Sequence, residues 1–150
     1  MKKFIVFFLI CSILFGVSLF KKEFDFSSYS NLQVQIYTSK KCNNKVKNAD
    51  YLDNGQGEII FCDYDTYKLI SSTEKNISGV TYIFSGNKQV FEDVISSLKV
   101  DVVEKSDTSF LGYTNSFSLG VDYQNKKVNV QGYYSDGRIF IGTPLLLGSY

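Results

Sequence analysis

Apolar and polar residues alternate through the last third of the chain, a pattern that predicts antiparallel strands. Asp136-Gly137 is a favoured pair for a two-residue hairpin turn, and Asn125-Lys126 predicts a second turn. The two turns bring four pairs of residues opposite each other: Tyr134 with Ile139, Gly132 with Ile141, Tyr123 with Val128, and Val121 with Val130. In this register the apolar residues share one face, and a slip of one residue would move them to the other.

A helix is predicted from Lys88 to Leu98, with Asn87 as its N-cap. Its apolar residues recur at helical spacing: Val90, Phe91, Val94, Ile95 and Leu98. We expect this helix to pack on the apolar face of the strands, where Gly132 leaves room. The stretch from Asp63 to Glu74 fits either a strand or a short helix capped by Asp65.

The remaining pattern predicts further strands over residues 32–38, 58–62, 80–84 and 100–104, with a long polar loop over 39–57. The expected fold class is therefore α+β: an antiparallel-rich sheet with one main helix packed on one face, preceded by an N-terminal signal or anchor helix. The expected domain organisation has three parts: a signal peptide or membrane anchor (1–22), a connector (23–31) and a single α+β domain (32–150).

The N-terminal segment has the pattern of an export signal. Lys2 and Lys3 precede an uncharged run of 17 residues, Phe4–Phe20, and Lys21-Lys22 follow. A signal peptide cleaved after Ser18 and an uncleaved anchor both fit, because the run is at the lower limit for crossing a bilayer. We expect an exported protein, either secreted or anchored in the membrane through residues 4–20.

The charge of the expected domain argues against a nucleic-acid partner. Beyond Lys22 the chain has 12 Lys and Arg against 15 Asp and Glu, a net charge of −3. Binding to a phosphate backbone needs a basic face instead. The chain also has no His, which removes imidazole catalysis and the usual zinc sites. We expect no cofactor, no metal site and no catalytic set.

Two cysteines, Cys42 and Cys62, lie in the expected domain. In an exported chain they are candidates for a disulfide bond, which would close a loop of about 20 residues and contribute roughly 3 kcal/mol in the chain-entropy model. Two unpaired thiols are the alternative.

Three carboxylates, Glu58, Asp63 and Asp65, allow an alternative function as an exported hydrolase. Acid–base chemistry would need at least two of them in one concave pocket. The alternative interpretation is structural, with the carboxylates at a strand end and a helix cap. We expect a protein that is not an enzyme and that acts through contacts with an unknown protein or cell-envelope partner.

Three aromatic residues, Tyr113, Tyr133 and Phe140, fall on the face opposite the expected core. If exposed, such a face can bind glycans or proteins. The alternative is that a second layer of structure, such as the N-terminal strands, covers them.

The C-terminal region contains Asn129-Val130-Gln131, Asp136-Gly137-Arg138 and the run Ile141-Gly142-Thr143-Pro144-Leu145. This region resembles the C-terminal part of the YwmB-type family of exported Firmicutes proteins. The resemblance extends back through Gly79–Phe84 and the helix that follows, and it covers about half of the chain. It implies an exported α+β domain with a TATA-box-binding-protein-like fold. That fold would suggest DNA binding, but export and the acidic balance argue against it here.

Overall fold

The structure is a computed structural model that describes residues 24–146. The predicted signal or anchor segment, Phe4–Phe20, lies outside the described residues. Within residues 24–146, no helix is long and apolar enough to cross a membrane.

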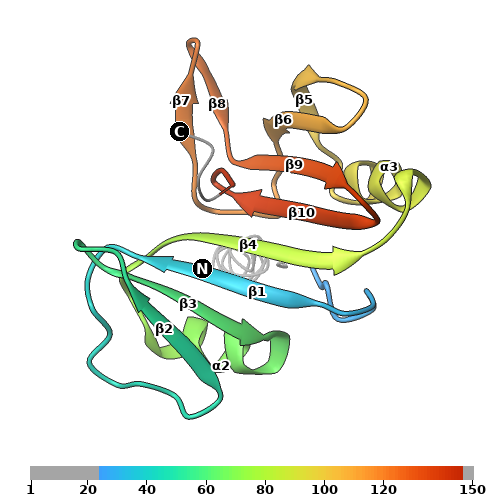
Figure 1. The fold of residues 1–150 in the computed structure, drawn as a ribbon. Helices are drawn as coiled ribbons and strands as arrows, with labels where there is room; N and C mark the ends of the chain where they lie inside the picture. Colours follow the sequence, from blue (N-terminus) through green and yellow to red (C-terminus); the bar gives the residue numbers. More distant parts are fainter. Residues whose placement is uncertain (1–23, 147–150) are drawn as a thin grey trace, which may run out of the picture.

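One large antiparallel sheet forms the centre of the domain (Figure 1). The elements follow one another as β1 (Gln33–Thr38), β2 (Ala49–Asp53), β3 (Glu58–Asp63), α2 (Tyr64–Thr73), β4 (Ile77–Ser85), α3 (Lys88–Ser97), β5 (Asp101–Lys105), β6 (Ser109–Tyr113), β7 (Val121–Tyr123), β8 (Lys126–Val128), β9 (Val130–Ser135) and β10 (Arg138–Thr143). Eight strands form the sheet in the order β2-β3-β1-β4-β10-β9-β6-β5, and β7 pairs with β8 separately. The α+β class is confirmed.

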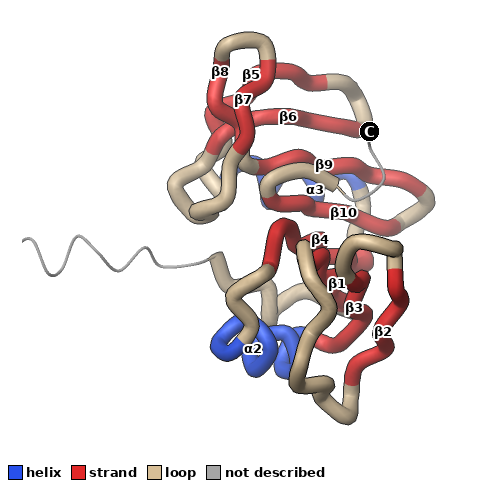
Figure 2. The backbone as a smooth tube through the Cα atoms, turned by 90° about the vertical axis from the view of Figure 1, so that its left-hand side faces the viewer, coloured by secondary structure: helices blue, strands red, loops and turns tan. Residues whose placement is uncertain are grey.

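Two helices, rather than the single main helix that we expected, pack on the sheet. Tyr67 of α2 contacts Tyr82 edge to face, with ring centroids 5.6 Å apart, and Phe91 of α3 contacts Phe110 at 5.6 Å. Tyr82 and Phe110 belong to one row across the strands, through Ile141 and Gly132, so both helices cover the same face. Figure 2 shows α2 beside the N-terminal strands on this side. We call it the covered face.

Each helix begins at a side-chain cap. The prediction for α3 is confirmed, because the Asn87 side chain accepts a hydrogen bond from the Val90 amide at 3.0 Å. The segment that fitted either a helix or a strand is the helix α2. Its cap is Asp63, which accepts from the Thr66 amide at 2.7 Å, and not Asp65.

The turn at Asp136-Gly137 is confirmed, and Tyr134 pairs with Ile139 as predicted. The second predicted register is wrong, because Val121 pairs with Val128 and the turn lies at Gln124-Asn125. Both pairs of turn residues have positive φ: Asp136 51°, Gly137 76°, Gln124 46° and Asn125 63°. Asn125 therefore occupies the second turn position and not the first, which shifts the pairing by two residues.

Phe26 lies at the centre of the covered-face core, although residues 23–31 were assigned to a connector. Its ring is 0% exposed and stacks on Tyr82, with the centroids 4.1 Å apart. Its centroid also lies 6.0 Å from that of Phe84. The described part of that segment is therefore packed into the domain.

Candidate functional site

The second face of the sheet is not covered by either helix of the described chain, and we call it the open face (Figure 1). Alternate residues of each strand point to it. Ile83, Phe140, Tyr133 and Ser109 form one row across β4, β10, β9 and β6. Within this row Ile83 is buried and Tyr133 is exposed, so the open face is buried at β4 and reaches solvent at β9.

A groove of about 760 Å³ lies over the centre of the open face. We call it the open-face groove. Its principal lining residues come from four strands: Gln35, Thr81, Gln131, Tyr133, Arg138 and Phe140. Its volume is in the range of small-molecule sites.

An aromatic pair, exposed Tyr133 and half-buried Phe140, forms one wall of the groove. Tyr133 is 43% exposed, and its ring centroid lies 6.3 Å from that of Phe140, with the planes tilted by 40°. The guanidinium of Arg138 lies 5.6 Å from the Phe140 ring centroid. Arg138 is the only arginine in the chain, and it forms no ion pair with any residue in 24–146. The wall therefore combines the exposed Tyr133 ring with a planar cation that lies over the Phe140 ring and has no ion pair among the described residues.

The floor of the groove carries neutral hydrogen-bonding groups. Thr81 is 3% exposed, and its hydroxyl has no hydrogen-bond partner among the described residues. Gln131 accepts a hydrogen bond from the Leu146 amide at 3.1 Å. A Cβ at Gly142 would lie 2.6 Å from the Leu146 nitrogen, so the chain after β10 passes directly over Gly142 and bounds the groove.

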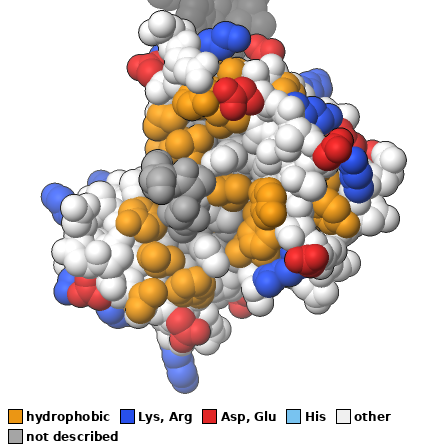
Figure 3. Space-filling view, turned by 45° about the horizontal axis from the view of Figure 1, so that its top comes forward, with side chains coloured by type: hydrophobic (Ala, Val, Ile, Leu, Met, Phe, Trp, Pro, Cys, Tyr) orange, Lys and Arg blue, Asp and Glu red, His pale blue; other side chains and the backbone are white. Residues whose placement is uncertain are grey.

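A second hollow of about 690 Å³ adjoins the groove over β1, β3 and β2, and Gln35 lines both. Phe61, which is 37% exposed, stands in it. The charged residues that line the two hollows are Asp50, Asp63, Asp136 and Arg138. Figure 3, which views this face at an angle, shows clusters of hydrophobic side chains with charged side chains mostly toward the margins. This lining lacks the basic character that a phosphate backbone requires.

The structure separates the three predicted aromatic residues. Tyr133 and Phe140 are neighbours in the groove. Tyr113 lies on the same face at the far end of β6, half-buried and opposite Asp101 of β5, and it does not line the groove.

Cys42 and Cys62, the candidates for a disulfide bond, are both free thiols in the structure. Cys62 lies on the covered face opposite Ala49. Burial raises the pKa of each thiol to about 11, and the nearby Glu74 carboxylate adds to the rise at Cys42. Both groups are consequently protonated, weakly reactive thiols at neutral pH.

The three carboxylates of the hydrolase hypothesis do not share a pocket. Glu58 and Asp63 lie at opposite ends of β3 and point to opposite faces, because they are five positions apart in a strand. Asp63 caps α2, while Asp65 is exposed and pairs with Lys68 at 2.7 Å. Within residues 24–146, no group of three or more Cys, Asp or Glu is placed to hold a metal ion.

Glu58 has a structural environment instead. Its carboxylate lies 2.7 Å from the Lys45 ammonium and accepts the Cys42 amide at 2.9 Å. These contacts hold the pKa of Glu58 below its ordinary value, the ion pair being the larger cause. The side chain is 4% exposed, so it anchors the polar loop before β2 against the sheet.

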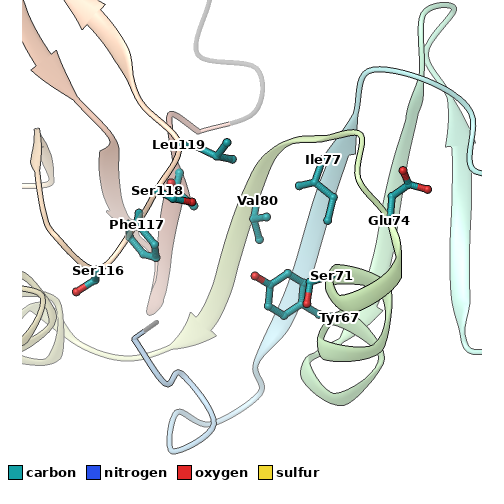
Figure 4. Close-up of a pocket in the computed structure, with 10 residues that line it drawn as sticks. Tyr67, Ser71, Glu74, Ile77, Val80, Ser116, Phe117, Ser118 and Leu119 are labelled. Atoms are coloured by element: carbon teal, nitrogen blue, oxygen red, sulfur yellow. The ribbon is translucent and has the colours of Figure 1, made fainter. Parts of the chain in front are cut away.

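A smaller cavity of about 320 Å³ lies on the covered side, between α2 and the loop before β7 (Figure 4). Tyr67 and Ser71 of α2 stand on one side of it, and Phe117 of the loop stands on the other. Thr143 lines it with a buried hydroxyl that also has no partner among the described residues. Glu74 also lines this cavity, and its carboxylate accepts hydrogen bonds from Asn76, which hold it in a local turn.

No family model, curated protein or solved structure matches this chain in the three comparisons. The resemblance to the YwmB-type family therefore stays a prediction.

Sequence reasoning placed Tyr133 and Phe140 on the correct side of the sheet. It missed Gln35, Thr81 and Gln131, which reach the groove only because β1, β4 and β9 lie near one another around β10. The alternation within each strand predicts the face of the sheet to which each side chain points, but it does not predict which strands are neighbours.

Proposed function

We propose that the protein is an exported or membrane-tethered, non-catalytic domain that acts through contacts with a protein or cell-envelope partner. In this proposal the open face is the contact surface. The observation that carries it is the sheet face that neither helix covers, with its groove and with exposed Tyr133 beside half-buried Phe140. Contiguous exposed apolar groups rimmed by polar ones are typical of interaction sites.

Two other observations support the proposal. The carboxylates Glu58, Asp63 and Asp65 are each engaged in local structure and are not gathered in a pocket. The hollows of the open face are lined by three aspartates and a single arginine, which lacks the basic character that DNA or RNA requires.

The export part is tested by adding protease to intact cells and to cells stripped of their wall. We expect the domain to be digested in at least one of the two preparations. Protection in both would contradict export and the proposed function with it.

The contact surface is tested by placing a photoreactive amino acid at position 133 and irradiating intact cells. The matched control carries the same amino acid at position 69, an exposed position of α2 on the other side of the sheet from the groove. We expect a discrete adduct from position 133 that is absent or weaker from position 69. Equal adducts from both positions, or none from 133, would contradict a role for the open face.

A further inference from the structure

We infer that the open-face groove binds a sugar that carries a carboxylate, one or two rings in size. The inference rests on the proposed function, in which the open face is the contact surface, and it narrows the partner to one chemical class. Three features of the groove lead to it: the aromatic wall, the neutral polar floor and the uncommitted arginine.

The aromatic wall suits a pyranose ring. One face of a sugar ring presents several C–H groups, and these pack against the electron-rich face of an aromatic side chain. Tyr133 is 43% exposed, and the Phe140 ring lies beside it, 6.3 Å away between centroids and tilted by 40°. The Tyr133 ring is therefore the stacking surface for one sugar ring, and Phe140 packs beside it.

The floor suits sugar hydroxyls. A hydroxyl both donates and accepts, which matches the carboxamide of Gln35 in the groove. The Thr81 hydroxyl beneath it is buried, so it adds to the polarity of the floor without a direct contact.

Arg138 adds the carboxylate. A guanidinium binds a carboxylate through two parallel hydrogen bonds, a geometry that lysine does not reproduce. Arg138 stands beside Phe140 at the rim of the groove and has no acidic partner among the described residues. The nearest lining carboxylate, Asp136, accepts a hydrogen bond from Ser135. A sugar stacked on the aromatic wall places an acidic substituent within reach of the guanidinium.

The position of the groove within the sheet disfavours an extended peptide. Peptides that bind sheets by adding a strand need a free strand edge. The groove lies over β4, β10 and β9, and each of these strands is paired on both sides. Their backbone groups are engaged in the sheet, so side chains alone must recognise the ligand.

The test is isothermal titration calorimetry on the full chain in a detergent that contains no sugar. Two acidic sugars are compared with their neutral counterparts: glucuronic acid with glucose, and N-acetylmuramic acid with N-acetylglucosamine. The two acids represent two sources of the same chemistry, a uronic acid polysaccharide and the cell-wall glycan. We expect at least one acid to bind on the order of tenfold more tightly than its neutral counterpart, as one charge-assisted contact predicts.

Two variants separate the contributions of the wall and the arginine. Tyr133→Ala should weaken the binding of both the acidic and the neutral sugar, on the order of tenfold. Arg138→Gln should reduce binding of the acid to the level of the neutral sugar and leave the neutral sugar unchanged. Leu69→Ala on α2 and Lys127→Gln on the β7–β8 hairpin are the matched controls, and neither should change the binding of either sugar.

Three outcomes would overturn the inference: no binding of either acid, equal binding of acids and neutral sugars, or equal losses in the control variants. If the acids do not bind while position 133 gives a protein adduct in cells, the sugar inference fails and the proposed contact surface stands. If the domain proves not to be exported, the proposed function fails whatever the titration shows.

Discussion

The two faces of the sheet are built from the same strands but differ in how far their side chains are buried. On the covered face, Phe26 and Ile36 are 0% exposed beneath helices and loops. On the open face, Tyr133 and Phe61 are 43% and 37% exposed. Because successive residues of a strand point to opposite faces, each strand contributes to both surfaces. The difference indicates that the covered face contributes most of the stability of the domain, while the open face is the surface that we propose for recognition.

The largest expected contrast lies between Phe26→Ala and Tyr133→Ala. Phe26 is fully buried and stacked on Tyr82, so its truncation should lower the free energy of unfolding by about 3–5 kcal/mol. Tyr133 is exposed, and its truncation should cost less than about 1 kcal/mol. Urea denaturation of the two variants measures both values. A similar cost for both would show that the open face also supports the fold.

Gly132→Ala tests how tightly the covered face is packed. A Cβ at Gly132 would lie 2.0 Å from the Phe110 ring, which in turn contacts Phe91 of α3. Such overpacking should cost about 1–3 kcal/mol in unfolding free energy. The double variant with Phe110→Leu should lose less unfolding free energy than the two single variants lose together. Strictly additive losses would contradict the steric explanation.

Glu58→Gln tests the contacts of the buried Glu58 carboxylate with the exposed Lys45 ammonium and the Cys42 amide, and it should cost about 1–3 kcal/mol at neutral pH. The pKa of Glu58 is lowered in the folded state, so its contribution is present above the ordinary value of 4.5 and is lost as the pH falls through the folded value. The stability difference between the natural protein and the variant should therefore shrink below about pH 4.5.

The matched control for this prediction is Asp65→Asn, which removes an exposed ion pair with Lys68 and should cost less than about 0.5 kcal/mol. Thermal unfolding as a function of pH measures both variants. A difference for Glu58→Gln that does not change with pH would contradict the assigned ion pair.

The smallest effect is expected for Thr81→Val on the open face. This substitution keeps the shape of the side chain and removes a buried hydroxyl that has no partner among the described residues. The unfolding free energy should stay equal or rise by less than about 1 kcal/mol. Thr143→Val, at the cavity on the covered side, should have the same small effect on the unfolding free energy. A loss above about 1 kcal/mol at either site would mean that the hydroxyl is hydrogen-bonded in the folded protein.

The parts of the fold that local sequence could predict are those with local causes. Asp136-Gly137 specifies its own turn, and the Asn87 cap with the spacing of Phe91 and Val94 specifies α3. Strand β2 lies inside a segment that we expected to be a polar loop. It is held by pairing with β3 and by distant contacts such as the Glu58–Lys45 ion pair, which no local pattern contains.

The candidate site shows the same limit. Alternation alone placed Tyr133 and Phe140 away from the core, but it could not show that Gln35 and Thr81 stand near them. That arrangement depends on β10, from the end of the chain, pairing with β4 from its middle. Strand order is a global property, whereas the direction in which a side chain points is local.

The pairing of β4 with β10 also has a consequence for how the molecule assembles. Residues 33–85 supply one half of the sheet and residues 101–143 the other, and β4 with β10 is the only strand pair that joins the two halves in the described chain. During synthesis from the N-terminus, β4 has one unpaired edge until the last strand has been made. A chain halted before Arg138 would keep that edge available to other chains, so truncation there should favour aggregation over a smaller folded product.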